Sequence, residues 1–391
     1  MYRQFTIALA LACLLVGLVA SPALAVEGMW QPHQLKQLRS ELKTLGLEID
    51  PDRLTNLLDH PMNAVIGLGF CTASFVSPRG LVVTNYHCAY GSIQYNSREG
   101  ANLEQTGFLA ADDASELPAR PGTHVFVTVA VDDVSARIHA AAEDLSGGER
   151  YNAVEAAQKE LVRACEEDPG HRCNVRAFHG GLEYYRIKQL EVRDVRLVYA
   201  PAGSVGQYGG DIDNWMWPRH TGDFAFFRAY VGPDGKTADY SEDNVPYRPV
   251  HHLKVSAAGV EEDDFVMVLG YPGRTNRYRT SAEIQSAIDW YYPTRGQRYL
   301  EWLEIIERET ADRPDDAIKY DGRKAGLNNS IKNYQGMLEG FAKSDVVARK
   351  RAQEAELRRW VESDPGRSTL YLESLDRLDR LIGHELATRE R

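Results

Sequence analysis

The 391-residue sequence predicts a mainly β fold with α-helical elements, arranged as a β-rich region followed by a helical one. Two observations lead to this class. Between residues 64 and 269, short apolar stretches alternate with turns that contain glycine or proline, which is typical of a barrel or a sandwich. From about Ser281 onward, apolar residues recur every three or four positions within a highly charged sequence, which indicates helices. We therefore expect a β-rich domain over residues 26–275 and a helical domain over residues 276–391.

The first 25 residues have the pattern of a secretory signal peptide. Arg3 gives a positive start, Ile7 to Ala20 is an apolar run without a charge, and an Ala-x-Ala sequence ends at Ala25. A membrane anchor is the alternative, but the run is short for a bilayer span and a cleavage signal follows it. We expect a signal peptide over residues 1–25, and hence a periplasmic or secreted protein.

The composition restricts the partners of the protein. The formal net charge of −11 argues against a nucleic-acid partner, which would favour a basic face. No segment after the signal peptide is apolar enough to cross a bilayer, so we expect no membrane partner. We also predict no cofactor.

Four cysteines remain when Cys13 leaves with the signal peptide. An even number in an exported chain favours disulfides, and three pairings are open. The most economical one joins Cys71 to Cys88 and Cys165 to Cys173. A zinc site is the alternative, but the sequence has no Cys-x-x-Cys pair and His171 is an isolated ligand candidate, so we predict no metal.

The predicted elements follow from the spacing of apolar residues. We expect a helix over 31–48 and a short helix around 54–58 on the surface, and a helical insertion over 133–166. The predicted strands are 64–70, 72–76, 81–85, 125–131, 184–199, 223–231, 252–255 and 265–269.

A predicted hairpin over residues 71–88 carries the first candidate for chemistry. Its second strand leads to the sequence Thr-Asn-Tyr-His-Cys, and a disulfide from Cys71 to Cys88 would hold His87 at the end of the hairpin. Trypsin-like serine peptidases present their catalytic histidine in a similar way. The alternative is a structural disulfide beside an incidental histidine.

A catalytic histidine needs a carboxylate that fixes its tautomer, and Asp223 is the best candidate. It opens an apolar strand after a His-Thr-Gly turn, whereas its rivals Asp211 and Asp213 lie in a loop. The alternative for Asp223 is a strand-initiating cap.

Two polar clusters accompany this pair. Asn214, Trp215 and Trp217 lie in a Gly/Asp-rich loop, where tryptophans often line a pocket, although we expect Trp217 in the core. Residues 327–333 place several asparagines within a predicted helix, where asparagine is unfavourable. The second cluster indicates either a helix break, a polar function or exposed caps.

These residues lie within motifs that resemble the family of bacterial serine peptidases containing dipeptidyl-peptidases 7 and 11. The similarity extends over essentially the whole mature chain. The matching motifs are Gly28-Met-Trp, Pro61-Met, Gly69-Phe-Cys-Thr-Ala-Ser-Phe-Val-Ser-Pro, Thr84-Asn-Tyr-His-Cys, Ser92-Ile-Gln-Tyr-Asn-Ser, Gly209-Gly-Asp, Asp213-Asn-Trp-Met-Trp-Pro-Arg-His-Thr-Gly-Asp-Phe, Gly270-Tyr-Pro-Gly-Arg-Thr and Leu327-Asn-Asn.

The resemblance implies a chymotrypsin-like double β-barrel with an α-helical domain as a cap. It implies that His87 is the general base and Asp223 its orienting carboxylate. It further implies that Asn214, Trp215 and Asn329 hold the free α-amino group of a peptide substrate. The expected activity is that of an exported serine dipeptidyl-peptidase, which releases dipeptides from peptides with a free amino terminus. The family tends to form homodimers, but the sequence shows no interface.

The sequence departs from the family pattern in two respects. The family usually has two adjacent histidines before the cysteine, and here Tyr86 replaces the first. Its nucleophilic serine lies after the helical domain in a Gly-Asn-Ser-Gly-Ser-like turn, and no such turn occurs here, since the surroundings of Ser204 lack the pattern. We therefore expect the amino-terminal portion of such an enzyme, with an incomplete second barrel, a partial cap and no activity alone.

Two alternatives to this assignment remain. One is a catalytically inactive secreted fragment that binds peptide amino termini, and the other is a trypsin-like endopeptidase. The side-chain preference at the scissile position and the oligomeric state are not decided by the sequence.

Overall fold

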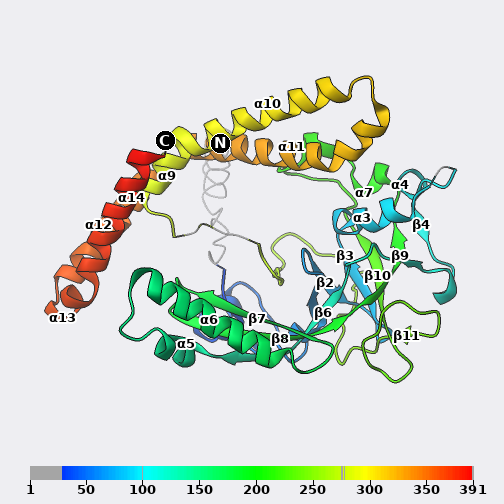
Figure 1. Cartoon of the computed structure of the whole chain (residues 1–391), viewed down its shortest axis with the longest axis horizontal. Coiled ribbons are helices and arrows are strands. Elements are labelled where there is room, and N and C mark those ends of the chain that lie inside the picture. The colour runs from blue at the N-terminus through cyan, green and yellow to red at the C-terminus, as the bar shows by residue number, and fades with distance from the viewer. Residues whose placement is uncertain (1–28, 99, 274–275, 277, 390–391) are drawn as a thin grey trace, which may run out of the picture.

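The computed structural model describes residues 29–98, 100–273, 276 and 278–389 of the chain, so the expected signal peptide lies outside the described residues. Figure 1 shows a β-rich body, a long helical hairpin along one side of it, and a helical arm that extends away from it. Within the described ranges, no helix combines the length and apolar character needed to span a bilayer.

The β-rich body contains one large antiparallel sheet. Its strands lie in the order β4-β9-β10-β3-β2-β1-β6-β8-β7, with β11 on β10 and β5 on β9. The strands are β1 (Val65–Gly67), β2 (Thr72–Phe75), β3 (Leu81–Thr84), β4 (Phe108–Leu109), β5 (Leu117–Pro118), β6 (Val125–Asp133), β7 (His171–Phe178), β8 (Glu183–Val192), β9 (Asp194–Ala200), β10 (Ala225–Val231) and β11 (Val245–Pro246).

The core lies beneath the central strands. In β10, Ala225, Phe227 and Ala229 are fully buried, because alternate residues of a strand point to the same face. Ala225 pairs with Thr84 and Phe227 pairs with Val82, so β10 and β3 contribute to the same apolar layer. This pairing fixes the ends of the two strands relative to each other.

Two of the predicted strands are wrong. Segments 252–255 and 265–269 have extended or irregular backbone without strand pairing among the described residues. Phe265, Met267 and Leu269 nevertheless pack against an apolar cluster of the N-terminal helices, while Val266 and Val268 are exposed. The alternating burial of this apolar run is that of a strand, but among the described residues no neighbouring strand pairs with it.

Strand β7 was missed because its sequence is polar. It carries Arg172, Asn174 and Arg176, and it begins after the end of the predicted helical insertion over 133–166. The insertion itself consists of α5 (Ser135–Ala141) and α6 (Gly147–Cys165), which pack on β7 and β8.

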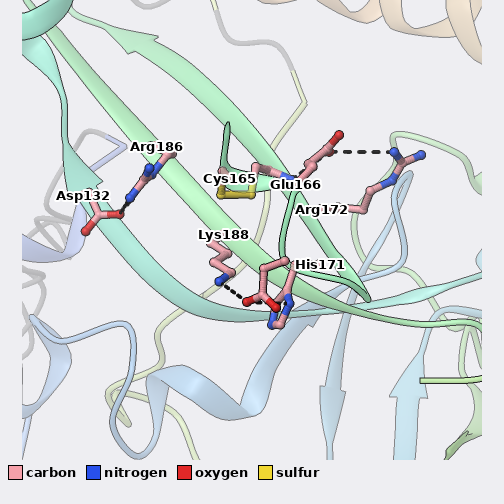
Figure 2. Close-up of a disulfide and its surroundings, with 9 residues drawn as sticks. Asp132, Cys165, Glu166, His171, Arg172, Arg186 and Lys188 are labelled. Carbon is pink, nitrogen blue, oxygen red and sulfur yellow. Dashed lines mark hydrogen bonds and ion pairs between the residues drawn. A yellow bond between two sulfur atoms is a disulfide. The ribbon is translucent and has the colours of Figure 1, made fainter. Parts of the chain in front are cut away.

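The structure contains both disulfides, Cys71–Cys88 and Cys165–Cys173. The second joins the end of α6 to β7, and ion pairs surround it (Figure 2). Its neighbours form the pairs Arg186–Asp132 at 2.8 Å, Lys188–Asp168 at 2.5 Å and Glu166–Arg172 at 3.7 Å.

Short helices cover the edges of the sheet. The predicted helix over 31–48 is a 3-10 helix, η1 (Pro32–Leu38), followed by the α-helix α2 (Arg39–Thr44). The helix predicted around 54–58 is displaced: η2 (Pro51–Leu54) ends at Leu54, and residues 55–58 form no helix. The remaining short elements of the body are η3 (Met62–Ala64), α3 (Tyr86–Asn96), α4 (Leu103–Thr106), η4 (Asp113–Ser115), α7 (Gly203–Gly206) and α8 (Gly210–Asp213).

The region from Ser281 onward is helical, as predicted. Helices α10 (Tyr292–Thr310) and α11 (Pro314–Ala342) lie side by side, with Leu303, Leu327 and Ile331 buried between them (Figure 1). The other helices are α9 (Ser281–Ser286), η5 (Ala287–Tyr291), α12 (Val346–Glu362), α13 (Pro365–Arg367), η6 (Ser368–Leu372) and α14 (Glu373–Thr388).

Candidate active site

His87 lies in the first turn of helix α3, and not at the end of a strand as the sequence suggested. Strand β3 ends at Thr84, Asn85 is the N-cap residue, and the chain turns directly into the helix. The buried Cys88 is joined to Cys71, which precedes β2. The disulfide therefore ties the first turn of α3 to the neighbouring strand and restricts the position of the preceding histidine.

Asp223 contacts His87 through both of its carboxylate oxygens. His87 Nδ1 lies 2.8 Å from Asp223 Oδ2, and the backbone N–H of His87 donates to Oδ1 at 3.0 Å. The side-chain amide of Asn85 donates to Oδ2 and to the backbone carbonyl of Asp223, both at 3.2 Å. Because Asp223 comes two residues before β10 and His87 three residues after β3, the pairing of these strands brings the two residues together.

The environment of Asp223 favours its charged form. Partial burial opposes ionisation, but the hydrogen bonds from the His87 ring, from its backbone N–H and from Asn85 outweigh it, so the pKa of Asp223 is lower than usual. A carboxylate accepts only, so Nδ1 of His87 carries the shared proton. This arrangement leaves Nε2 as the basic nitrogen, on a side chain that is 65% exposed.

The rival carboxylates take no part in this pair. Asp211 and Asp213 belong to α8, and Asp211 Oδ2 accepts a hydrogen bond from Asn328 at 3.0 Å. Potential metal ligands of Cys71, His87 and Cys88 lie within 4.8 Å of one another, but both sulfur atoms are in the disulfide and offer no thiolate.

The structure also brings together Asn214, Trp215 and Asn329, although the third residue comes from a distant helix. Asn329 Oδ1 accepts from Asn214 Nδ2 at 2.7 Å and from Trp215 Nε1 at 3.0 Å. Trp215 has a φ of 60°, which is uncommon for a bulky residue. Amide oxygens beside an indole ring provide hydrogen-bond acceptors and an apolar wall. We refer to these three residues as the Asn–Trp–Asn group.

Trp217 is not in the core, contrary to our expectation, because its side chain is 91% exposed. The structure adds Arg219, which sequence reasoning did not single out. Its Nη1 donates to Asn214 Oδ1 at 3.3 Å and its Nε donates to Thr221 Oγ1 at 3.0 Å. Arg219 and Asn85, which donates to Asp223, both lie within the motifs that carry the family resemblance. Those motifs are the sequence feature that could have identified the two residues.

No serine completes the site among the described residues. The His87 ring is hydrogen-bonded to Asp223 through Nδ1. Ser204 lies on the short helix α7 and lines a small cavity of about 260 Å³ with Val205, Tyr208 and His220. The structure therefore presents a hydrogen-bonded histidine–carboxylate pair, with no serine bonded to its imidazole among the described residues.

Comparisons with known proteins show which family the chain belongs to. The Peptidase S46 family model matches residues 25–391. An Asp/Glu-specific dipeptidyl-peptidase of Shewanella putrefaciens is 48% identical over 350 residues, which cover 89% of this chain and 47% of that protein. Dipeptidyl-peptidase 7 of Porphyromonas gingivalis is 37% identical over 381 residues, covering 94% of this chain and 52% of that protein.

The structural comparison gives the same result. The crystal structure of Porphyromonas endodontalis DPP11 in complex with substrate matches with a TM-score of 0.82 and 32% identity, covering 92% of this chain and 53% of that one. The chain thus spans about half the length of the relatives it matches. From residue 25 onward its sequence fits one family model throughout. The chain therefore belongs to the Peptidase S46 family.

Proposed function

We propose that the chain is the amino-terminal portion of an exported serine dipeptidyl-peptidase that releases dipeptides from the free amino terminus of peptides. The observation that carries this proposal is the hydrogen bond between His87 and Asp223, which leaves Nε2 of a mostly exposed imidazole available. Because the chain spans about half of its relatives, the activity would belong to a protein of their length. The two disulfides support export.

In this mechanism His87 acts first as a base and then as an acid. Its Nε2 takes the proton from the hydroxyl of a serine supplied by a segment outside this sequence, and the serine oxygen attacks the carbonyl carbon of the second peptide bond. The imidazolium, stabilised by Asp223, returns the proton to the leaving amine, which gives an acyl-enzyme. Water, activated by His87, then releases the dipeptide.

The Asn–Trp–Asn group would measure the distance from the substrate's amino terminus. A terminal ammonium donates hydrogen bonds. Among the described residues, Asn214 Oδ1 accepts only from Arg219 and has room for one, whereas Asn329 Oδ1 would exchange one of its two present bonds for the substrate. The indole of Trp215 would close the site against longer chains. A peptide with a blocked amino group would leave these polar groups without their partner and lose binding energy.

We further propose that the β-rich domain, residues 26–275, is a chymotrypsin-like double barrel whose second barrel is incomplete in this chain, and that residues 276–391 form part of the cap. The strand-like alternation of Phe265, Met267 and Leu269, without a pairing partner among the described residues, supports this proposal.

The test is the substitution His87→Ala in the full-length protein, assayed with dipeptidyl reporter substrates. Both acidic and non-acidic reporters are needed, because one matched relative is named as Asp/Glu-specific and the other carries no specificity in its name. We expect turnover to fall by about 10⁴- to 10⁶-fold. His33→Ala, which removes an exposed histidine that contacts Tyr185, is the matched control and should keep full activity.

Normal turnover by the His87→Ala variant would refute the assignment. Cleavage of amino-blocked peptides at the same rate would favour the trypsin-like endopeptidase. If the wild type cleaves neither kind of substrate but binds free dipeptides and not acetylated ones in calorimetry, the protein is a binding protein for peptide termini. The missing nucleophile at His87 is the observation that keeps this second candidate open.

A further inference from the structure

Two side chains of α11 next to the Asn–Trp–Asn group have no role in the function proposed above. Asn328 and Lys332 belong to the polar stretch 327–333 and lie one helical turn apart, so they share a face of α11. Both contact α8, the short helix that precedes Asn214 and Trp215. We propose that Asn328 and Lys332 are positioning residues, a clamp that sets the geometry of the substrate amino-terminus site.

The contacts of the clamp come from one face of α11. Asn328 Nδ2 donates to Asp211 Oδ2 at 3.0 Å. The Lys332 ammonium donates to the backbone carbonyl of Asp211 at 2.6 Å and also to that of Ile212. Carbonyl groups at the end of a helix lack partners within the helix, and an ammonium group is a favourable one. Lys332 therefore satisfies backbone groups that α8 leaves open.

Helix α8 depends on such contacts because it has no core of its own. It has four residues and none of them is buried, and its one large apolar side chain, Ile212, is 82% exposed. Two residues further along, Trp215 adopts its unfavourable φ of 60°, which persists only when neighbouring contacts enforce it. Polar contacts to α11 thus take the place that apolar packing has elsewhere in the body.

The clamp has a direct consequence for recognition. Asn329 lies on α11 between the two clamp residues, whereas Asn214 and Trp215 follow α8. Their hydrogen bonds of 2.7 and 3.0 Å require α8 and α11 to keep one separation. Lys332 acts by holding that separation and not by contacting substrate, since its positive charge would repel a substrate ammonium. This inference rests on the proposed function.

The test replaces Lys332 in the full-length protein and separates KM from kcat. Lys332→Met keeps most of the side-chain length but removes the charge and the donors. We expect KM for an unblocked dipeptidyl reporter to rise about tenfold, the effect of losing one charged hydrogen bond. We expect kcat to stay within about twofold, because the sheet holds His87 and Asp223 independently. Lys332→Arg should recover part of the loss.

The matched control is Lys319→Met, which removes an ammonium from the same helix that pairs with Asp316 instead of α8. It should leave KM unchanged. The double variant Asn328→Ala/Lys332→Met should lose less than the sum of its single variants, because both act on one contact. An unchanged KM in Lys332→Met, or a fall in kcat with KM unchanged, would overturn the clamp.

A second measurement needs no activity. In the wild type, the amides of Asp213 and Met216 donate to Gly209 and Asp213 carbonyls, so they should be protected from hydrogen exchange. Lys332→Met should accelerate exchange over residues 209–216, and Lys319→Met should not. Unchanged exchange in Lys332→Met refutes the clamp even if the enzyme is active. Accelerated exchange in a protein that neither cleaves nor binds dipeptides supports the clamp and refutes the proposed function.

Discussion

The His87–Asp223 pair and the Asn–Trp–Asn group are held in place by different means. His87 lies in the first turn of α3, just after β3, and Asp223 lies just before β10; these two strands are hydrogen-bonded to each other over buried core residues. The disulfide Cys71–Cys88 fixes the turn that carries His87. The Asn–Trp–Asn group joins an exposed segment to a helix from a distant part of the chain, and its hydrogen bonds are solvent-accessible.

This difference indicates which part of the site can lose its contacts by local unfolding. Exposed hydrogen bonds contribute about 0.5–1.5 kcal/mol each, whereas a buried side chain such as Phe227 contributes about 1.5–3 kcal/mol through its area alone. Segments with few buried contacts open at lower free energy than the core does. The geometry of the His87–Asp223 pair therefore depends on the buried sheet, while that of the Asn–Trp–Asn group depends on the contact between α8 and α11.

The largest effect is expected from Asp223→Asn, which tests the His87–Asp223 pair, the part of the site that the sheet holds. The amide would present an N–H group to Nδ1 of His87, so the ring would carry its proton on Nε2 and lose its basic nitrogen there. We expect kcat of the full-length enzyme to fall by about 10⁴-fold at unchanged KM.

The variant should remain folded, because asparagine is nearly the same size and keeps an acceptor for the backbone N–H of His87. Circular dichroism and the melting temperature check this. A loss of recognition together with kcat would show that the two halves of the site are coupled, contrary to the comparison.

The disulfides offer a second test, on stability. Removing Cys71–Cys88 as a pair of serines releases a loop with a sequence separation of 17, which corresponds to about 3 kcal/mol in the chain-entropy model. Removing Cys165–Cys173, with a separation of 8, corresponds to about 2.5 kcal/mol. Urea unfolding measures both values.

Removal of the two disulfides should affect kcat more differently than it affects the free energy of unfolding. Loss of Cys71–Cys88 frees the turn that carries His87 and should lower kcat, whereas loss of Cys165–Cys173 affects the α6–β7 insertion and should leave kcat unchanged. Equal kcat values in the two folded variants would contradict a role of the first disulfide in holding His87.

Sequence patterns predicted the buried strands well and failed where pairing or composition decided the outcome. The apolar run that follows Asp223 is strand β10, because its alternate residues fill the core. The Phe265–Leu269 segment, which is apolar throughout, forms no strand, since an apolar run does not indicate whether a neighbouring strand is available to pair with it. Strand β7 was missed because an edge position lets charged residues occupy it.

The candidate site was predictable at the level of residue type and not of geometry. The Thr-Asn-Tyr-His-Cys ending pointed to His87, but only the structure shows that the residue starts a helix. The link between Asn329 and Trp215 spans 114 residues, and no periodicity in the sequence indicates it. The contacts of Asn328 and Lys332 with α8 also join distant parts of the sequence, so no pattern predicted them. The unusual asparagines in α11 did indicate this segment, for which a polar function was one of the predicted alternatives.

The smallest expected effect is a dependence of stability on pH through Asp223. Its lowered folded-state pKa means that its contribution is complete above the unfolded value of about 3.9 and is lost as pH falls through the folded value. The stability advantage of the wild type over Asp223→Asn in urea unfolding should therefore shrink between pH 5 and pH 3. Asp239→Asn is the control, because Arg193 also lowers the Asp239 pKa but that side chain is 85% exposed and solvent-screened. A stability advantage that stays constant down to pH 3, or that shrinks equally in the control, would show that the fold does not hold the Asp223 carboxylate. In that case the His87–Asp223 pair would not be more firmly held than the Asn–Trp–Asn group.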